Sequence, residues 1–244
     1  MPAELLVLGG TRMARKAATA LAASGWQVVY SLAGLTSAPA LPCGVRLRTG
    51  GFGGAKGLAL WLQANKTCAI IDATHPFART MHSNAAMAAR MAAIPCLRLE
   101  PPPFQPARRD IWIRVPDAAH AARTIPPHMR LFAALGSHGL AKLAARTDLH
   151  IMARVMTPPT WPVPPRWRIL ITRPSPTMAS ELARLRALRT QAIICRNSGA
   201  RSAIPLLHAA RILRLPVIMI SRPKQEHGKA FHDLKALMAA LRKS

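Results

Sequence analysis

The chain has 244 residues, which is the size of one large domain or two small ones, and half of its residues are hydrophobic. Charged residues make up only 18%, which excludes a highly charged disordered chain. Lysine and arginine number 34 and acids nine, so the formal net charge is +25. Because the acids are few and scattered, we expect no metal site built from carboxylates.

The four cysteines, at 43, 68, 96 and 195, form no C-x-x-C pair and have no histidine at zinc-finger spacing. Cys68, Cys96 and Cys195 lie in or beside apolar runs, so we expect buried thiols there, and a reducing, cytoplasmic compartment. The first residues lack the basic segment of a signal peptide, and apolar runs such as 215–220 are too short to cross a bilayer. We therefore expect no membrane partner, and a monomer is the working expectation.

In the first half, short β-rich runs alternate with stretches rich in Ala and Leu. This alternation predicts βαβ units, which form a mainly parallel sheet with helices on both faces. The expected strands are 4–8, 27–31, 45–48, 68–72 and 96–99, and the expected helices are 12–24, 54–65 and 80–93.

A proline-rich run at 101–106 interrupts the pattern, and the alternation then begins again. The sequence therefore predicts an α/β protein with two Rossmann-like domains, 1–104 and 105–244. The expected strands of the second half are 111–115, 130–134, 150–153, 168–172, 191–195 and 217–220, and the expected helices are 117–124, 138–146, 178–189, 203–213 and 231–242.

Ligands of open α/β sheets bind beyond the carboxyl ends of the strands, so the loops there are the candidate sites. Gly9-Gly10-Thr11-Arg12 follows the first strand, where small residues and free helix amides suit a phosphate. The spacing is not a full G-x-G-x-x-G, and a tight turn without a ligand is the alternative. Ser31 stands where NAD-binding folds usually carry an acid, so any dinucleotide bound here is expected to be NADPH.

Two further loops of the first half are candidates. Gly50-Gly51-Phe52-Gly53-Gly54 has the highest glycine density and suggests backbone lying against a flat ligand; a flexible turn is the alternative. Asp72 to Phe77 is a polar cluster after a buried strand, stiffened by Pro76. In it, His75 is the candidate acid, and an exposed loop histidine is the alternative. The other eight histidines show no ligand spacing, and we expect surface or structural roles for them.

The segment 196–201 follows a strand of the second half and holds two arginines with Asn, Ser and Gly. Such a segment suits carboxylate groups, and a solvated turn is the alternative. The excess of Lys and Arg is spread along the chain, and the eleven aromatic residues form no stacking motif. We therefore expect no specific nucleic-acid partner.

These loops together resemble the precorrin-6A reductase family of cobalamin biosynthesis. The segments that carry the resemblance are Leu-Gly-Gly-Thr-x-x-Ala-Arg at 8–15, Tyr-Ser-Leu-Ala-Gly-x-Thr at 30–36, Gly-Gly-Phe-Gly-Gly at 50–54 and Asp-Ala-Thr-His-Pro-Phe-Ala at 72–78, followed more thinly by Arg98-Leu99-Glu100, Asn197-Ser198-Gly199, 209–211 and 215–217. The resemblance implies two Rossmann-like domains, a precorrin-type tetrapyrrole in the cleft between them, and NADPH-dependent reduction of one macrocycle double bond to give precorrin-6B.

The resemblance also implies roles for individual residues. Cofactor contacts are expected at Gly9, Gly10, Thr11, Arg12, Ser31, Gly34, Gly51, Phe52, Gly53 and Thr74. Contacts with the carboxylate-bearing macrocycle are expected at Phe77, Arg154, Arg173, Arg196, Asn197, Ser198 and Arg201, because guanidinium groups bind carboxylates in fork geometry. His75 is the expected proton donor to the reduced π-system. Water or the ring nitrogens of the substrate are alternative donors.

The chain departs from the family pattern at several positions. Met13 stands in place of a Glu, and Leu35 in place of an Arg, so one phosphate contact is expected to be lost. The remaining departures lie at 135–137, 172–176, Cys195, Ala200 and Leu206. Because most lie in the second half, they bear on substrate handling more than on the cofactor. Two other functions stay open: an NADP-dependent reductase of another substrate, and a basic nucleic-acid-binding module without catalysis.

Overall fold

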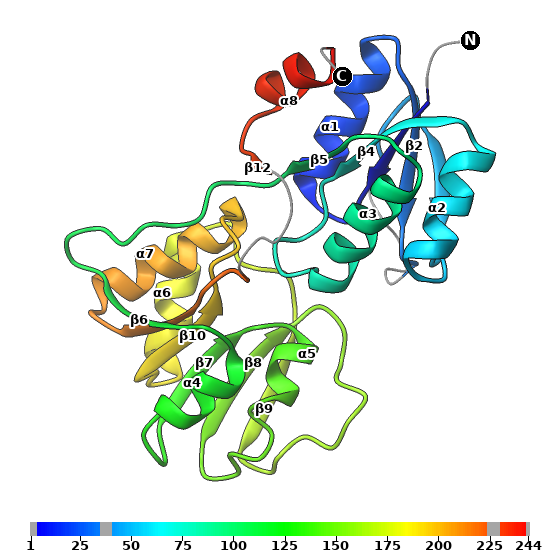
Figure 1. The fold of residues 1–244 in the computed structure, drawn as a ribbon. Helices are drawn as coiled ribbons and strands as arrows, with labels where there is room; N and C mark the ends of the chain where they lie inside the picture. The colour runs from blue at the N-terminus through cyan, green and yellow to red at the C-terminus, as the bar shows by residue number, and fades with distance from the viewer. Residues whose placement is uncertain (1–3, 35–40, 224–229, 243–244) are drawn as a thin grey trace. The chain divides into compact units, whose positions relative to one another are not determined.

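The computed structural model describes residues 4–34, 41–223 and 230–242 (Figure 1). The chain divides into two compact units, one made of Met1–Pro102 with Pro223–Ser244 and the other of Pro103–Arg222. Each unit holds a six-stranded sheet in which every described strand pair is parallel. The predicted α/β class with two Rossmann-like sheets is confirmed.

The sheet of the first unit has the strand order β12-β5-β4-β1-β2-β3. Read from β3, this is the 3-2-1-4-5-6 order of dinucleotide-binding folds, with β12 in the sixth position. Its strands are β1 (Glu4–Leu8), β2 (Gln27–Leu32), β3 (Arg46–Thr49), β4 (Thr67–Asp72), β5 (Cys96–Leu99) and β12 (Ala230–Phe231), and its helices are α1 (Arg12–Ala23), α2 (Gly54–Ala64), α3 (Arg79–Met91) and α8 (Leu234–Leu241).

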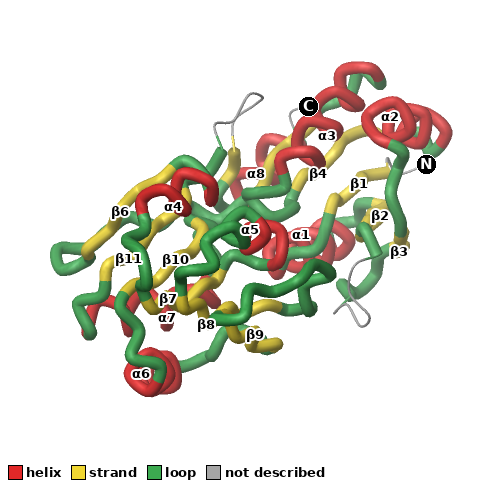
Figure 2. The backbone as a smooth tube through the Cα atoms, turned by 90° about the horizontal axis from the view of Figure 1, so that it is seen from below, coloured by secondary structure: helices red, strands yellow, loops and turns green. Residues whose placement is uncertain are grey.

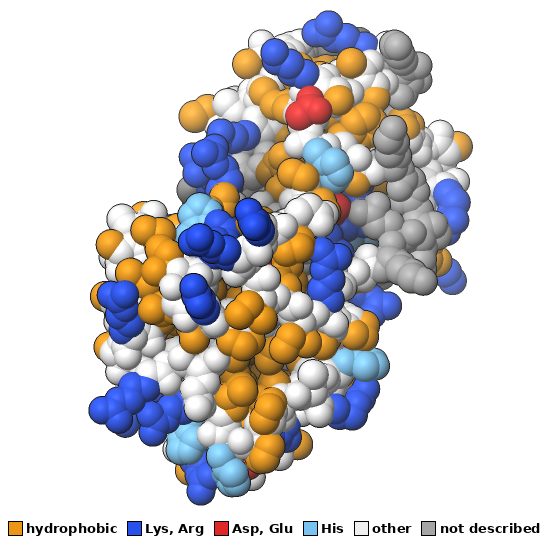
Figure 3. Space-filling view, turned by 90° about the vertical axis from the view of Figure 1, so that its left-hand side faces the viewer, with side chains coloured by type: hydrophobic (Ala, Val, Ile, Leu, Met, Phe, Trp, Pro, Cys, Tyr) orange, Lys and Arg blue, Asp and Glu red, His pale blue; other side chains and the backbone are white. Residues whose placement is uncertain are grey.

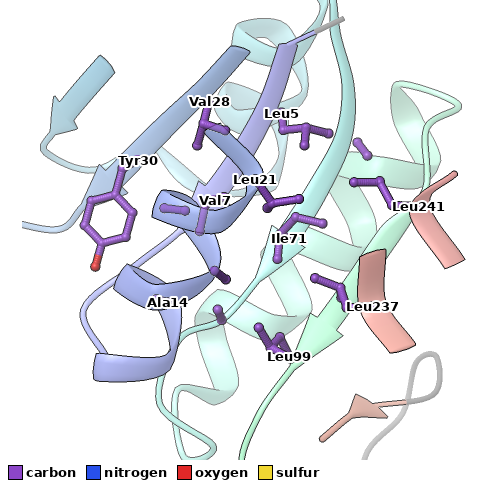
Figure 4. Close-up of a cluster of buried hydrophobic side chains, with 14 residues drawn as sticks. Leu5, Val7, Ala14, Leu21, Val28, Tyr30, Ile71, Leu99, Leu237 and Leu241 are labelled. Carbon is purple, nitrogen blue, oxygen red and sulfur yellow. The ribbon is translucent and has the colours of Figure 1, made fainter. Parts of the chain in front are cut away.

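The core of this unit forms on both faces of the sheet, because β1 is apolar at every position after Glu4. Leu5 and Val7 lie in a cluster with residues of α1 and α8, which Figure 4 shows in close-up. Leu6 and Leu8 belong to the opposite cluster, with residues of α2 and α3. A strand covered on both sides is apolar throughout rather than alternating, which explains why the sequence predicted it within its observed bounds.

The C-terminal segment corrects the predicted domain boundary. We expected residues 105–244 to form the second domain, but the chain returns after Arg222, and Leu237 and Leu241 of α8 are buried in the first core. The last helix also begins later than expected, at Leu234, because the Asp233 side chain caps it by accepting from the Ala236 amide at 2.8 Å. An amphipathic pattern shows that a helix has a buried face, but it does not identify the sheet that the helix covers.

The second unit has the order β6-β11-β10-β7-β8-β9, which can be followed in Figure 2. Its last five strands repeat the arrangement of the first unit, and the sixth position is filled by its first strand. The strands are β6 (Ile111–Val115), β7 (Arg130–Ala134), β8 (His150–Val155), β9 (Trp167–Ile171), β10 (Ala192–Arg196) and β11 (Pro216–Ile220), and the α-helices are α4 (Ala118–Thr124), α5 (Ser137–Ala141), α6 (Met178–Ala187) and α7 (Ile204–Ile212).

These strand orders place one topological switch point in each unit, where successive strands begin to be added on the other side. In the first unit it lies between β1 and β4, and in the second between β7 and β10. Loops at the carboxyl ends of these strands are where such sheets bind ligands. None of the helices in the described residues has the length and apolarity needed to span a membrane.

Candidate functional site

At the switch point of the first unit, Thr11 joins the loop after β1 to the loop after β4. Its hydroxyl donates to the carbonyl oxygen of Ala73, 62 residues away, at 2.8 Å. The hydroxyl oxygen of Thr11 also caps α1, because it accepts from the Ala14 amide at 3.0 Å. We expected Thr11 to contact the cofactor, and the structure gives its side chain two contacts within the chain. These two contacts hold the loop after β1 against the loop after β4.

The glycines of the first loop are required partly by a tyrosine that the sequence analysis did not single out. Tyr30, buried in β2, places its hydroxyl 3.1 Å from the Gly10 amide, which donates to it. A Cβ on Gly9 would lie 2.7 Å from that hydroxyl, so a larger residue at Gly9 would displace the ring. The close approach that we attributed to a phosphate is thus accounted for at Gly9 by Tyr30.

The start of α1 keeps the features of an anion site. The amides of Arg12 and Met13 have no acceptor within the described parts of the chain, and the first turn of this twelve-residue helix carries no acid. Arg12 is exposed, and Ser31 is buried at the end of the neighbouring strand β2. Free amides at the positive end of a helix attract phosphate oxygens, so these residues fit the phosphates of a dinucleotide.

Beyond β2, Gly34 has a positive φ of +82° and ends the described part of this loop. Leu35, the departure that we expected to cost a phosphate contact, lies outside the described residues.

The glycine-rich loop at 50–54 is held by Arg48 of β3, another residue that the sequence analysis did not single out. Its guanidinium donates to the carbonyl oxygens of Gly50 and Gly51 at 2.6 and 2.8 Å. The Phe52 ring lies 3.6 Å from this guanidinium and packs edge-on against Trp61 of α2 at 5.6 Å. Phe52, expected among the cofactor contacts, has its ring packed against its own unit. Gly51 and Gly53, by contrast, have open space around them.

The loop after β4 presents His75 in a defined tautomer. Its Nδ1 atom accepts from the Phe77 amide at 3.2 Å, so the neutral ring carries its proton on Nε2. The two rings lie 5.8 Å apart, and both side chains are partly exposed. Thr74 precedes them and is fixed by Asp72, whose Oδ1 accepts from the Thr74 hydroxyl at 2.7 Å. The loop thus presents an N–H donor at Nε2 from a rigid turn.

A buried polar network lies behind this loop. Asp72, 3% exposed, receives a 2.6 Å hydrogen bond from Nδ1 of His82, which belongs to the first turn of α3. Burial alone would raise the pKa of Asp72, but the hydrogen bonds from His82 and Thr74 outweigh it and lower that pKa. Arg98 of β5 donates to Nε2 of His82 at 3.0 Å. We had expected only a surface or structural role for His82, and no spacing in the sequence indicates these contacts.

The switch point of the second unit brings Arg196 beside Gly136. Arg196 ends β10, and its Nη2 atom would lie 3.5 Å from a Cβ on Gly136, in the loop after β7. Burial lowers the pKa of the Arg196 guanidinium. Ser198 is buried, and its hydroxyl accepts from the Ala200 amide at 3.3 Å, whereas Arg201 is exposed at the start of the next helical turn. The loop therefore gathers cationic groups at the edge where a ligand is expected.

Asn197, predicted as a substrate contact, has its side chain engaged within its own unit. Its side chain pairs with the backbone of Phe104, accepting from the amide at 2.7 Å and donating to the carbonyl at 3.0 Å. Arg222 donates to the carbonyl oxygens of Asn197 and Ser198, both at 2.9 Å. Both chain segments at the ends of this unit are thus fixed to one loop, and the amide of Asn197 is occupied by the backbone.

Arg154 is likewise engaged within its own unit. It is 6% exposed, forms an ion pair with fully buried Glu181 of α6, and lies 5.2 Å from the centre of the Phe132 ring. This pairing removes the reason to expect Arg154 on a substrate carboxylate. Arg173, after β9, is exposed. No cluster of His, Cys, Asp or Glu that would hold a metal occurs in the part of the chain that the structure describes.

The comparisons with known proteins agree with this architecture. The family model described as precorrin-6x reductase CbiJ/CobK matches residues 4–242. The chain is 40% identical to a precorrin-6A reductase of Rhodococcus erythropolis, covering 90% of this chain and 89% of that protein. It is 39% identical to that of Rhodobacter capsulatus, covering 90% and 88%. A solved structure titled CobK precorrin-6A reductase has a TM-score of 0.91 and 36% identity, covering 99% of this chain and 96% of that one.

Proposed function

The chain belongs to the precorrin-6x reductase CbiJ/CobK family, and from this we propose that it reduces precorrin-6A to precorrin-6B with NADPH. Among the loops at the carboxyl ends of the strands, the one that leads into α1 supports the cofactor assignment most strongly. Its free amides and exposed Arg12 suit phosphates, and the chain has no acid between Glu4 and Asp72. An acid at the end of β2 would bind a ribose 2′-hydroxyl and repel a 2′-phosphate, so Ser31 favours NADPH over NADH.

The chemistry divides between the cofactor and the protein. NADPH, when bound, supplies a hydride to one double bond of the macrocycle. The chain binds and orients the two reactants, which is where alignment gives large rate gains. Gly9, Gly10, Arg12, Ser31, Gly34, Gly51, Gly53 and Thr74 remain the proposed cofactor contacts.

A proton must also reach the reduced π-system, and His75 is the proposed donor. Donation requires the cationic ring: a proton from solvent binds Nδ1 in place of the contact from the Phe77 amide, and transfer of the Nε2 proton to the substrate then leaves a neutral ring. For the substrate carboxylates, we propose Arg173, Arg196, Ser198 and Arg201, with Phe77 contacting the ring system. Asn197 and Arg154 are left out of this set because the chain itself occupies their polar atoms.

The first test is anaerobic oxidation of NADPH by the purified chain, with and without precorrin-6A, followed by absorbance of both the cofactor and the macrocycle. Oxidation that depends on precorrin-6A and shifts the macrocycle spectrum supports the proposal. Tight NADPH binding without oxidation would point to another substrate, including a cobalt-containing macrocycle. Absence of NADPH binding would refute the cofactor assignment.

His75→Ala tests the proton donor. We expect a kcat lower by roughly 10²- to 10⁴-fold, the usual contribution of general acid catalysis, with little change in NADPH affinity. An unchanged turnover would assign the proton to water or to the substrate.

The location and assembly of the enzyme are part of the same proposal. All four cysteines are free thiols in the structure, which fits a reducing compartment, and we place the enzyme in the cytoplasm as a monomer. Sedimentation of the purified chain measures its oligomeric state directly.

A further inference from the structure

His82 is the centre of a chain of contacts that runs from β5 to the loop after β4. Arg98 lies 2.8 Å from Glu100 and donates to Nε2 of His82 at 3.0 Å. Nδ1 of His82 lies 2.6 Å from Oδ2 of Asp72. The other oxygen of Asp72 accepts from the amide and the hydroxyl of Thr74, at 3.2 and 2.7 Å. The members are buried or nearly so, so water does not replace these contacts.

The partners of His82 determine its protonation state. Arginine has no acceptor, so Nε2 of His82 must be the acceptor and carries no proton. The single ring proton then resides on Nδ1, where it is donated to Asp72. His82 is therefore neutral, with its tautomer fixed at both nitrogens by Arg98 and Asp72.

Protonation of the ring would set the Nε2–H donor against the donor of Arg98 at 3.0 Å. The charged or titratable groups around it are Asp72 on β4, Cys96 and Arg98 on β5, and Glu100 directly after β5. Cys96 stays neutral, because burial raises its pKa to about 12. A cationic His82 would thus break its contact with Arg98 while competing with Arg98 for the two carboxylates. The turn that Asp72 holds would lose its fixed geometry.

We propose that His82 is a positioning residue for the reduction, which in its neutral form holds Asp72 and thereby fixes Thr74 and His75. The inference rests on the proposed function, because Thr74 and His75 are the proposed cofactor contact and proton donor. It adds a requirement on the protonation states of two histidines, which the proposed function by itself does not specify. One histidine, His75, must carry a proton to donate, whereas another, seven residues along the chain, must remain neutral.

Two variants of His82 test the role. His82→Ala removes the contacts with Arg98 and Asp72 and the longer one, at 3.4 Å, with the Thr74 hydroxyl. We expect kcat to fall on the order of 10- to 100-fold, since a displacement of about 1 Å in a reacting group has this effect. KM for the macrocycle should change by less than about 3-fold, because the proposed ligands of its carboxylates lie on the second unit. His82→Asn places an amide donor where Nδ1 stood, and it should restore kcat to within about 3-fold of the wild type.

The matched control is His120→Ala, which removes another histidine paired with an aspartate, at 2.9 Å. This pair is exposed on α4, and the variant should behave as the wild type. A His82→Ala variant with wild-type kcat would overturn the proposal. So would a His82→Asn variant that folds and is as impaired as His82→Ala.

A measurement without substrate distinguishes failure of this inference from failure of the proposed function. In ¹⁵N-labelled protein, the His82 ring should show a proton on Nδ1 and none on Nε2 at neutral pH. The amide resonances of Thr74 and His75 should shift in His82→Ala and return toward their wild-type positions in His82→Asn. A cationic ring, the opposite tautomer or amides independent of His82 would refute the inference. Absence of any reductase activity would refute only the proposed function.

Discussion

Replacing Glu181 by Gln is expected to destabilise the second unit severely. Glu181 is fully buried and accepts from Arg154, from Arg184 at 3.2 Å and from the Ser175 amide at 3.1 Å. Glutamine keeps the volume but removes the charge, which leaves the Arg154 guanidinium, 5% exposed, without a counter-ion. Removal of one partner from a buried ion pair costs roughly 3–5 kcal/mol of unfolding free energy. Arg184 is more exposed, so the loss of its contact adds little.

For a chain of this length each kcal/mol lowers Tm by roughly 2–4 °C, so we expect a decrease of about 6–20 °C. Calorimetry or urea unfolding measures it, and three tryptophans (112, 161 and 167) report on the second unit. Glu4→Gln is the matched control, because its partner Arg46 is largely exposed and the pair contributes less than about 1 kcal/mol. Joint replacement of Arg154 by Met and Glu181 by Leu should restore stability. If Glu181→Gln and Glu4→Gln were equally stable, the buried pair would not have the importance assigned to it.

Four further outcomes are expected from other parts of the structure. Ser31→Asp places a carboxylate at the end of β2 and should reverse the cofactor preference toward NADH by at least about tenfold in kcat/KM, measured with both cofactors. Iodoacetamide at neutral pH should label exposed Cys43 and spare Cys195, whose pKa burial raises to about 12, as mass spectrometry will show. The lowered pKa of Asp72 means that its ionised form stabilises the fold above the usual carboxyl range and that this stability is lost as pH falls; Asp72→Asn should therefore flatten the acid decline of unfolding free energy below roughly pH 4. Salt should lower kcat/KM for the polyanionic macrocycle by screening the positive chain, with a smaller effect on kcat.

Periodicity predicted the elements whose burial is uniform. β1 was expected at 4–8 and occupies Glu4–Leu8, because both of its faces lie in a core. The expected helix at 138–146 ends at Ala141 instead. Beyond that point, the amides of Leu143 and Arg146 donate three residues back in successive turns. A sequence pattern of apolar residues does not distinguish such tight turns from a continuing helix, because both bury residues at similar spacing.

The site was predicted at the level of loops and less well at the level of side chains. The loops follow from a rule of chain direction, which needs no knowledge of tertiary contacts. The use of each side chain depends on partners that are remote in sequence: 62 residues separate Thr11 from Ala73, and 93 separate Asn197 from Phe104. Tyr30 as the neighbour of Gly9 and Arg98 as the partner of His82 were missed for the same reason, because each pair is remote in sequence. Residues expected to meet ligands were thus found holding the loops that present them.

The formal net charge of +25 reflects 34 lysines and arginines against nine acids. Every acid in the described ranges is engaged, and seven of these eight pair with Arg or His while Asp233 caps α8. Figure 3 shows Lys and Arg spread over the viewed face. On this face they do not form the continuous stripe that is typical of a nucleic-acid-binding surface. A diffuse positive field gives no sequence readout, but it raises the encounter rate of any polyanion. The phosphates of the proposed cofactor and the carboxylates of the proposed substrate are both of this kind, so the charge favours the approach of both reactants and leaves their orientation to the loops.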